Sequence, residues 1–113
     1  MTSDGSPYAR FRRALERGNL AMVRAAAAEL PRIDLADALE ILLLIGAADQ
    51  PTYDRAATRW LARFALERPS ARLDDLRRGL YALEALPYNP QGARSGLRAL
   101  CREHDLEQVA RRL

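Results

Sequence analysis

The apolar residues of this chain recur at helical spacing almost throughout, and one segment is apolar on every side of a helical wheel. Residues 39–48 read LEILLLIGAA, the only long apolar run in the sequence. A helix of that kind is buried, and at about 1.5 Å per residue a helix over 35–48 would be about 20 Å long, close to the diameter of a small domain. We therefore expect it to be the central helix, with Leu42, Leu43 and Ile45 buried. It is too short to span a bilayer, which needs about 20 apolar residues.

Amphipathic segments on both sides of this run predict six further helices. Ser6, Asn19, Asp34, Asn89 and Asp105 are placed to cap helix starts, because short polar side chains accept hydrogen bonds from the first free N–H groups. The expected ranges are 7–17, 20–30, 52–68, 71–86, 90–104 and a short last helix after residue 105. The side chains expected to face the core are Tyr8, Phe11, Ala14, Leu15, Leu20, Val23, Ala27, Leu30, Tyr53, Ala57, Trp60, Leu61, Phe64, Leu73, Leu76, Leu80, Tyr81, Leu83, Ala93, Leu97, Leu100, Cys101, Leu106, Val109 and Leu113.

The predicted fold is therefore all-α, either a compact bundle or a short solenoid-like stack of six to seven helices. We expect a flexible tail over residues 1–5 and a single domain over residues 6–113, since no low-complexity linker divides the chain. A domain of this size can build its own core. Gly79 in the middle of the fifth predicted helix costs about 1 kcal/mol relative to Ala, and close packing of a neighbouring helix is the expected reason for it.

The amino-acid composition bears on where the protein is located and on what class of partner it binds. All 18 basic residues are Arg, which is typical of a GC-rich genome, and the net charge is only +3. A dedicated nucleic-acid binder usually carries a stronger excess on one face. The single cysteine, Cys101, excludes an intrachain disulfide and favours a reducing compartment, and the polar N-terminus has no apolar signal segment. We expect a cytoplasmic protein.

Charge is unevenly distributed along the predicted helices. Residues 1–33 carry six Arg against three acidic residues, whereas residues 34–50 carry four acidic residues and no Arg. The simplest interpretation is internal pairing between the central helix and its neighbours in sequence. Exposed pairs of this kind contribute about 0–1 kcal/mol each, but they help to set how the helices align.

Two Arg stripes are the best candidates for a binding surface. They comprise Arg55, Arg59 and Arg63 on the fourth predicted helix, and Arg10, Arg13 and Arg17 on the first. The guanidinium group presents a rigid set of donors to carboxylates and phosphates. The alternative interpretation is a solvated helix face, with Asp54, Glu67 or the acidic start of the central helix as internal partners.

Two short segments resemble parts of known helical families. Residues 14–23 resemble the helix-turn-helix half of an ankyrin repeat, but no similar segment recurs about 33 residues later. The resemblance implies one ordinary helical hairpin. Residues 106–113 are similar to the first helix of a DNA-binding helix-turn-helix, without the recognition helix that reads bases. As a whole, the chain resembles small helical proteins of GC-rich bacteria, and that resemblance implies no activity.

Candidate chemistry is sparse. Cys101 and His104 lie three residues apart on one predicted helix face, but a nucleophile needs an orienting group and an oxyanion site, and zinc needs four ligands. We expect a buried, inert thiol beside a partly exposed histidine, with no metal and no cofactor. Tyr53, Trp60 and Phe64 form an aromatic row at helical spacing, expected to pack on the central helix; an exposed anchor for a partner helix is the alternative.

These patterns predict a non-enzymatic, cytoplasmic helical module that binds another protein. An Arg-rich surface is well suited to interfaces. The alternative is a nucleic-acid-associated or transcription-regulatory protein that uses the two Arg stripes. A homo-oligomer is compatible with either role, and no membrane partner is expected. An enzyme is a third possibility in principle, because helical bundles can assemble sites from residues distant in sequence.

Overall fold

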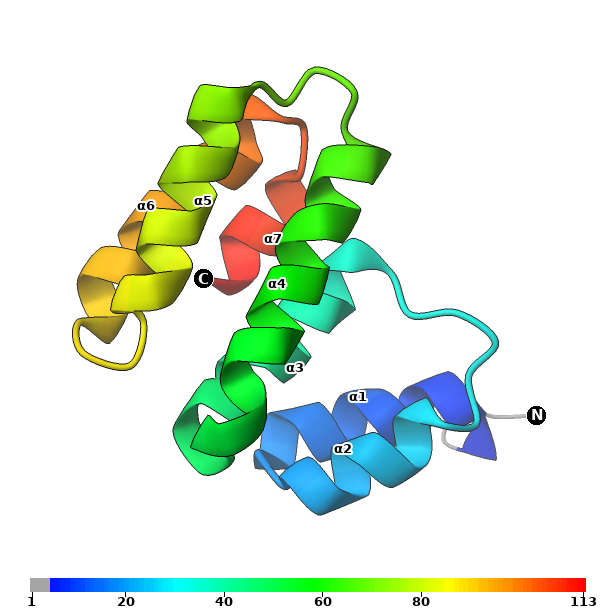
Figure 1. Ribbon diagram of the computed structural model, residues 1–113. Coiled ribbons are helices and arrows are strands. Elements are labelled where there is room, and N and C mark those ends of the chain that lie inside the picture. Colours follow the sequence, from blue (N-terminus) through cyan, green and yellow to red (C-terminus); the bar gives the residue numbers. More distant parts are fainter. Residues whose placement is uncertain (1–4) are drawn as a thin grey trace.

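The computed structural model describes residues 5–113, which form seven α-helices and no strand (Figure 1). The helices are α1 (Pro7–Arg17), α2 (Leu20–Ala27), α3 (Leu35–Ala48), α4 (Gln50–Glu67), α5 (Leu73–Ala85), α6 (Pro90–Glu103) and α7 (Glu107–Arg112). The predicted all-α class is confirmed. Of the predicted tail over residues 1–5, only Gly5 falls within the described residues.

Consecutive helices pair into three hairpins, α1 with α2, α3 with α4, and α5 with α6. The short α7 then packs against both α6 and α3 and so ties the end of the chain to its centre. Figure 1 shows the α1–α2 hairpin lying across one end of α3 and α4, while α5 and α6 lie on the other side. The arrangement measures 45 × 28 × 21 Å. Among the described residues, no helix combines the length and the apolar character needed to cross a membrane.

Most helix starts follow from local side-chain chemistry. Ser6, Asn19, Asp34 and Asn89 each accept a hydrogen bond from a backbone N–H in the first turn, as predicted. The prediction for Asp105 is wrong: its backbone is left-handed, with φ 60°, and Leu106 occupies the cap position of α7 without a side-chain bond. Helix α2 also ends earlier than residue 30. The N–H groups of Glu29 and Leu30 bond carbonyls three residues back, so the chain tightens into a turn before Pro31.

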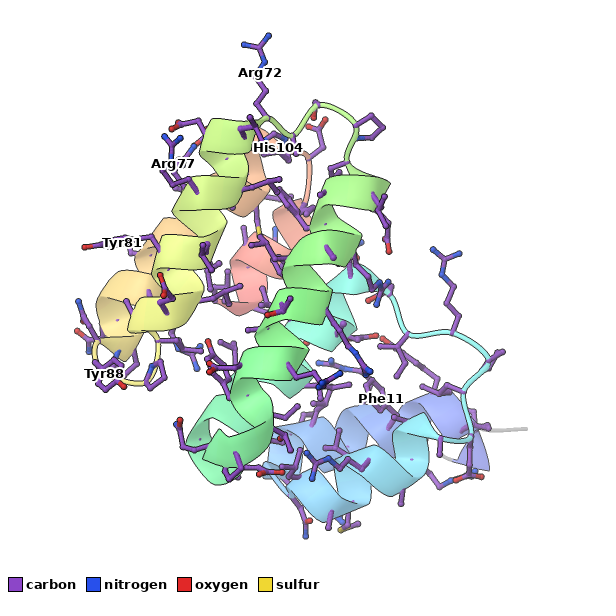
Figure 2. The ribbon with its side chains drawn as sticks, in the orientation of Figure 1. Phe11, Arg72, Arg77, Tyr81, Tyr88 and His104 are labelled. Carbon is purple, nitrogen blue, oxygen red and sulfur yellow. The ribbon has the colours of Figure 1, made fainter. Side chains whose placement is uncertain are left out.

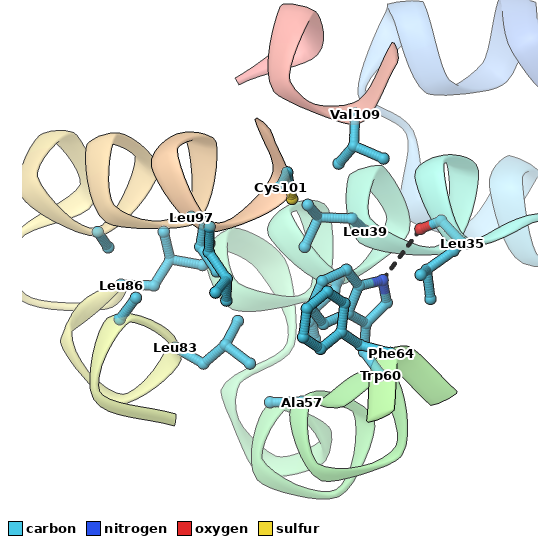
Figure 3. Packing of buried hydrophobic residues seen from close by; sticks show 14 of the residues in the cluster. Leu35, Leu39, Ala57, Trp60, Phe64, Leu83, Leu86, Leu97, Cys101 and Val109 are labelled. Carbon is cyan, nitrogen blue, oxygen red and sulfur yellow. Dashed lines mark hydrogen bonds between the residues drawn. The ribbon is translucent and has the colours of Figure 1, made fainter. Parts of the chain in front are cut away.

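The hydrophobic core is built around α3, which contacts α2, α4 and α7 (Figure 3). Leu39, Leu42 and Ile45 are buried, but Leu43 is only partly buried, contrary to the prediction. A helix that touches neighbours on three sides still leaves part of its circumference at the surface. A second, smaller cluster joins α1 to α2 around Phe11 and Val23.

The aromatic row of α4 packs into the core, as its spacing predicted. The rings of Trp60 and Phe64 stack with centroids 5.7 Å apart, and both side chains are buried. The indole N–H of Trp60 donates to the carbonyl of Leu35 at 3.0 Å (Figure 3). The hydroxyl of Tyr53 donates to the carbonyl of Leu83 at 2.6 Å. These two bonds satisfy the polar atoms that burial would otherwise leave unpaired.

Helix α5 is rotated relative to the prediction. Leu73, Leu80 and Tyr81 were expected to be buried, but they are 80%, 51% and 76% exposed. The face that α5 does bury contains Gly79 and Leu83. A Cβ at position 79 would lie 2.8 Å from Leu61 Cδ1 and 3.3 Å from Leu100 Cδ2, so Gly79 lets side chains of α4 and α6 pack closely against α5, which was the expected reason for a glycine there. Tyr8, also expected to be buried, is 46% exposed.

Candidate functional site

An apolar groove runs between α4 and α5. Its volume is about 470 Å³. The α4 wall consists mostly of small side chains and the α5 wall of leucines, with polar residues towards one end. The lining residues are Tyr53, Asp54, Ala57, Thr58, Leu61, Ala62, Ala65, Leu76, Leu80, Leu83 and Glu84. Figure 1 shows α4 and α5, which form the two walls, running alongside each other.

The leucines of α5 form a stripe that continues beyond the groove. Leu73, Leu76, Leu80 and Leu83 follow one another at intervals of three, four and three residues and therefore share one face of the helix. Leu83 is buried, whereas Leu73 and Leu80 are 80% and 51% exposed. Leu66, near the end of α4, is 82% exposed. Exposed leucines that are scattered singly are ordinary, whereas Leu76 and Leu80 share one face of α5 and line the same groove.

The two ends of the groove differ in charge. Asp54 and Glu84 lie at the end where α4 begins and α5 ends, and neither carboxylate has an ion-pair partner among residues 5–113. Asp54 adds to the effect of burial in raising the pKa of the neighbouring Tyr53 to about 12. Arg72, at the opposite end, is exposed, also without an ion-pair partner in the described part of the chain, and points away from the body of the molecule (Figure 2).

The six Arg residues predicted to form binding stripes lie on separate helices, α1 and α4, as expected. On α4, Arg63 pairs with Glu67 at 2.8 Å, while Arg55 and Arg59 are exposed and have no carboxylate partner within residues 5–113. On α1, Arg10 pairs with Glu29 at 3.3 Å; Arg13 is partly buried and Arg17 is exposed. Neither stripe lines the α4–α5 groove.

An ionic cluster that no local motif signals joins the two ends of the chain to α3. The carboxylate of Asp37, 1% exposed, accepts from Arg12 at 3.0 Å, from Arg112 at 2.7 Å and from the hydroxyl of Tyr8 at 3.0 Å. Glu40, one turn later, accepts from the same two arginines at 2.7 Å each. The expected pairing of the acidic central helix with its basic neighbours is thereby confirmed. The contribution of Arg112 was not foreseen, since it lies 75 residues from Asp37.

His104 contacts Ser70 and Asp75. Its Nε2 lies 3.1 Å from an Asp75 carboxylate oxygen, and its Nδ1 lies 3.0 Å from the Ser70 hydroxyl. A carboxylate only accepts, so Nε2 carries a proton and donates it to Asp75. This order of serine, histidine and carboxylate occurs in hydrolases, here with the two ring nitrogens exchanged.

The same three side chains also connect chain segments. Asp75 accepts the backbone N–H of Arg72 at 2.9 Å, which is the main cause of its lowered pKa, with His104 and Arg78 adding to it. His104 caps the end of α6, and Ser70 lies in the α4–α5 connection. The group therefore fastens this connection to the start of α5 and the end of α6. None of the three side chains lines the α4–α5 groove.

His104 is 8% exposed, so the prediction of a partly exposed histidine is wrong. Its ring packs edge-on against Phe64, with centroids 5.4 Å apart, and is covered there by α4. The side chain of Cys101 is fully buried, as predicted. Within residues 5–113 there is no group of three or more His, Cys, Asp or Glu side chains placed to hold a metal ion.

We predict that the Cys101 thiol is chemically inert in the folded protein. Burial raises its pKa to about 11, so at neutral pH almost none of it is the reactive thiolate. Labelling by a thiol reagent at pH 7.5 should be slower by about a hundredfold or more than in urea-unfolded protein. Labelling of the native protein at the unfolded rate would contradict this and would reopen a role for Cys101 beside His104.

Comparison of the chain with protein-family models, with curated proteins and with solved structures gives no match.

Proposed function

We propose that this protein is a small, non-enzymatic module of the cytoplasm that binds another protein chain, and that the α4–α5 groove receives a helix of that partner. The observation that carries the proposal is the apolar groove with its leucine wall, of which Leu80 is half exposed. Burying one leucine side chain contributes about 1.5–3 kcal/mol. Because several leucines of this surface are in contact with water, the most favourable free energy of binding is expected from an apolar helix that covers them.

The groove also limits the chemistry of the partner. A helix lying in it would place apolar side chains at intervals of three and four residues against Leu76 and Leu80. A basic side chain at one end of that helix would meet Asp54 and Glu84, which have no cation partner among the described residues. An amphipathic helix with a cationic end therefore fits better than an acidic or a uniformly polar one. A cytoplasmic location agrees with the lone, buried Cys101.

The test is a matched pair of charge substitutions. Leu80→Glu places a carboxylate in the groove, and Tyr88→Glu places one on the α5–α6 connection at a side chain that is 88% exposed. A partner is first identified by affinity capture from the native cell and then purified, and its dissociation constant is measured with each variant. We expect Leu80→Glu to weaken binding by tenfold or more and Tyr88→Glu to leave it unchanged. Equal binding by the two variants would reject the groove as the site.

A second candidate function is association with nucleic acid through the Arg stripe of α4. It is favoured by Arg55 and Arg59, which are exposed and lack a carboxylate partner within residues 5–113. Each arginine–phosphate interaction that a substitution removes should reduce the slope of log K against log salt by about 0.9 for duplex DNA. A salt-dependent affinity for generic duplex or single-stranded nucleic acid would favour this role.

We predict that replacing Arg55, Arg59 and Arg63 together by Gln changes stability little. Within residues 5–113, only Arg63 of the three forms an ion pair, with Glu67, and such a pair contributes about 0.3–0.5 kcal/mol. Thermal unfolding and nucleic-acid titration of the triple variant measure the two effects separately. A control variant with Arg77, Arg102 and Arg111 replaced by Gln removes the same charge elsewhere. If both variants bind nucleic acid as the parent does, the α4 stripe is not a nucleic-acid site.

A further inference from the structure

The leucine stripe of α5 reads the same in both directions. Leu73, Leu76, Leu80 and Leu83 are separated by three, four and three residues, and reversing the helix reproduces that order. The spacing corresponds to two consecutive pairs of the a and d positions of a heptad, the positions that interlock between paired helices. Leu83 is buried in the core of its own chain, so the symmetric contact open to an antiparallel copy is the one between Leu76 and Leu80.

We propose that the helix received by the α4–α5 groove is α5 of a second copy of this chain, related by a two-fold axis that passes between the two α5 helices at the level of position 78. The inference rests on the proposed function and names its partner. In this antiparallel arrangement Leu76 faces Leu80 of the second copy, and the exposed Leu73 lies level with position 83 of the second copy, whose own leucine is buried. The contact between Leu76 and Leu80 occurs twice, as in any interface between two identical surfaces related by a two-fold axis.

The charges at the groove ends complement one another in the same arrangement. Reversing α5 carries Arg72 of the second copy to the end of the groove that Asp54 and Glu84 line. Arg72 and Glu84 are twelve residues apart in the sequence, or about 18 Å along the helix, so they lie at opposite ends of the stripe. Among residues 5–113 none of these three side chains has an ion-pair partner in the single chain. In the dimer, Arg72 of one copy would lie at the same end of the interface as the Asp54 and Glu84 carboxylates of the other, and this occurs at both ends.

The shapes of the two walls also favour this pairing. Ala57, Ala62 and Ala65 leave the α4 wall shallow, whereas Leu73 and Leu80 project from α5. Leucines of one copy can enter the space beside the alanines of the other, as knobs enter holes between packed helices. The interface is short, because α5 has only 13 residues. A small interface of this size points to a reversible dimer, and not to an obligate one.

The experiment is sedimentation velocity over about 1 µM to 1 mM protein. We expect the parent to pass from monomer to dimer, Leu80→Glu to weaken dimerisation by tenfold or more, and Tyr88→Glu to match the parent. Two charge variants then test the register. Arg72→Glu alone and Asp54→Arg/Glu84→Arg alone should each dimerise more weakly than the parent, because like charges meet. An equimolar mixture should dimerise more tightly than either variant alone, because both ends of the interface again join opposite charges.

Three outcomes would overturn the inference. The parent could stay monomeric over the whole concentration range, the dimer could remain intact in Leu80→Glu, or the mixture of charge variants could dimerise no more tightly than each variant alone. These failures are distinct from failure of the proposed function. If the parent is a monomer but an identified partner no longer binds Leu80→Glu, the groove binds a different chain and only the dimer is rejected. If Leu80→Glu changes neither dimerisation nor partner binding, both are rejected. If the equimolar mixture of the two charge variants dimerises more tightly than either variant alone, both variants must be folded, because a misfolded chain could not form the interface.

Discussion

Replacement of Leu42 by Ala is expected to lower the free energy of unfolding by about 2–5 kcal/mol. Leu42 is 2% exposed on α3, the helix around which the main core is built. Removing its side chain takes apolar contacts from the core and leaves a cavity that the neighbouring helices cannot fully close. Urea unfolding measures the change, with the dependence of the free energy of unfolding on urea concentration fitted as one value for parent and variant.

The matched control for this prediction is Leu43→Ala on the same helix. Leu43 is only partly buried, so the same atoms are removed from a site already in contact with water, and the decrease in stability should be clearly smaller than at Leu42. Equal decreases at the two positions would mean that the surface side of α3 is covered in solution, by a second copy or by another chain. A negligible decrease at Leu42 would contradict the central place of α3.

The second large effect is expected at Asp37. Asp37→Ala should lower the free energy of unfolding by about 2–4 kcal/mol, somewhat less than the usual cost of breaking a buried ion pair. The variant leaves Arg12, Arg112 and the Tyr8 hydroxyl without their shared acceptor. The cost is reduced because both arginines are partly exposed and keep Glu40 as a partner. Thermal and urea unfolding measure it.

Asp74→Ala is the matched control, because it removes the same group from an exposed pair with Arg77. Its expected cost is about 0–1 kcal/mol. A cost at Asp37 no greater than that at Asp74 would show that the cluster does not hold α1 and α7 to α3. Hydrogen exchange gives a second readout: with Asp37→Ala, the amides of α7 should lose protection before those of α4 and α5.

Much of the fold was predictable because it depends on residues close together in the sequence. The start of α3 at Leu35, for example, follows from Asp34, whose carboxylate accepts the N–H of Asp37 at 2.8 Å. The burial of Trp60 and Phe64 follows from a single apolar stripe on α4. The pairing of the acidic central helix with α1 followed from blocks of opposite charge, although the particular residue, Arg12, lay outside the stripes that spacing selected.

The groove was not predictable, because it depends on how α5 is rotated. Leu73, Leu76, Leu80 and Leu83 form an apolar arc that would suit a core helix equally well. The close approach of Leu61 and Leu100 at Gly79 turns part of that arc outward. A helical wheel shows which side of a helix is apolar, but it contains no information on how much of that side its neighbours cover.

The sequence by itself determined the helices, most of their caps, the central place of α3 and the balance of charge between neighbouring segments, because backbone hydrogen bonding and apolar periodicity act over a few residues. Only the tertiary structure decided that Arg112 meets Asp37, that His104 lies between Ser70 and Asp75, and that the leucines of α5 remain at the surface. The polar contacts among these join residues 29 to 75 positions apart. They depend on the angles and rotations at which whole helices pack, which no local pattern specifies.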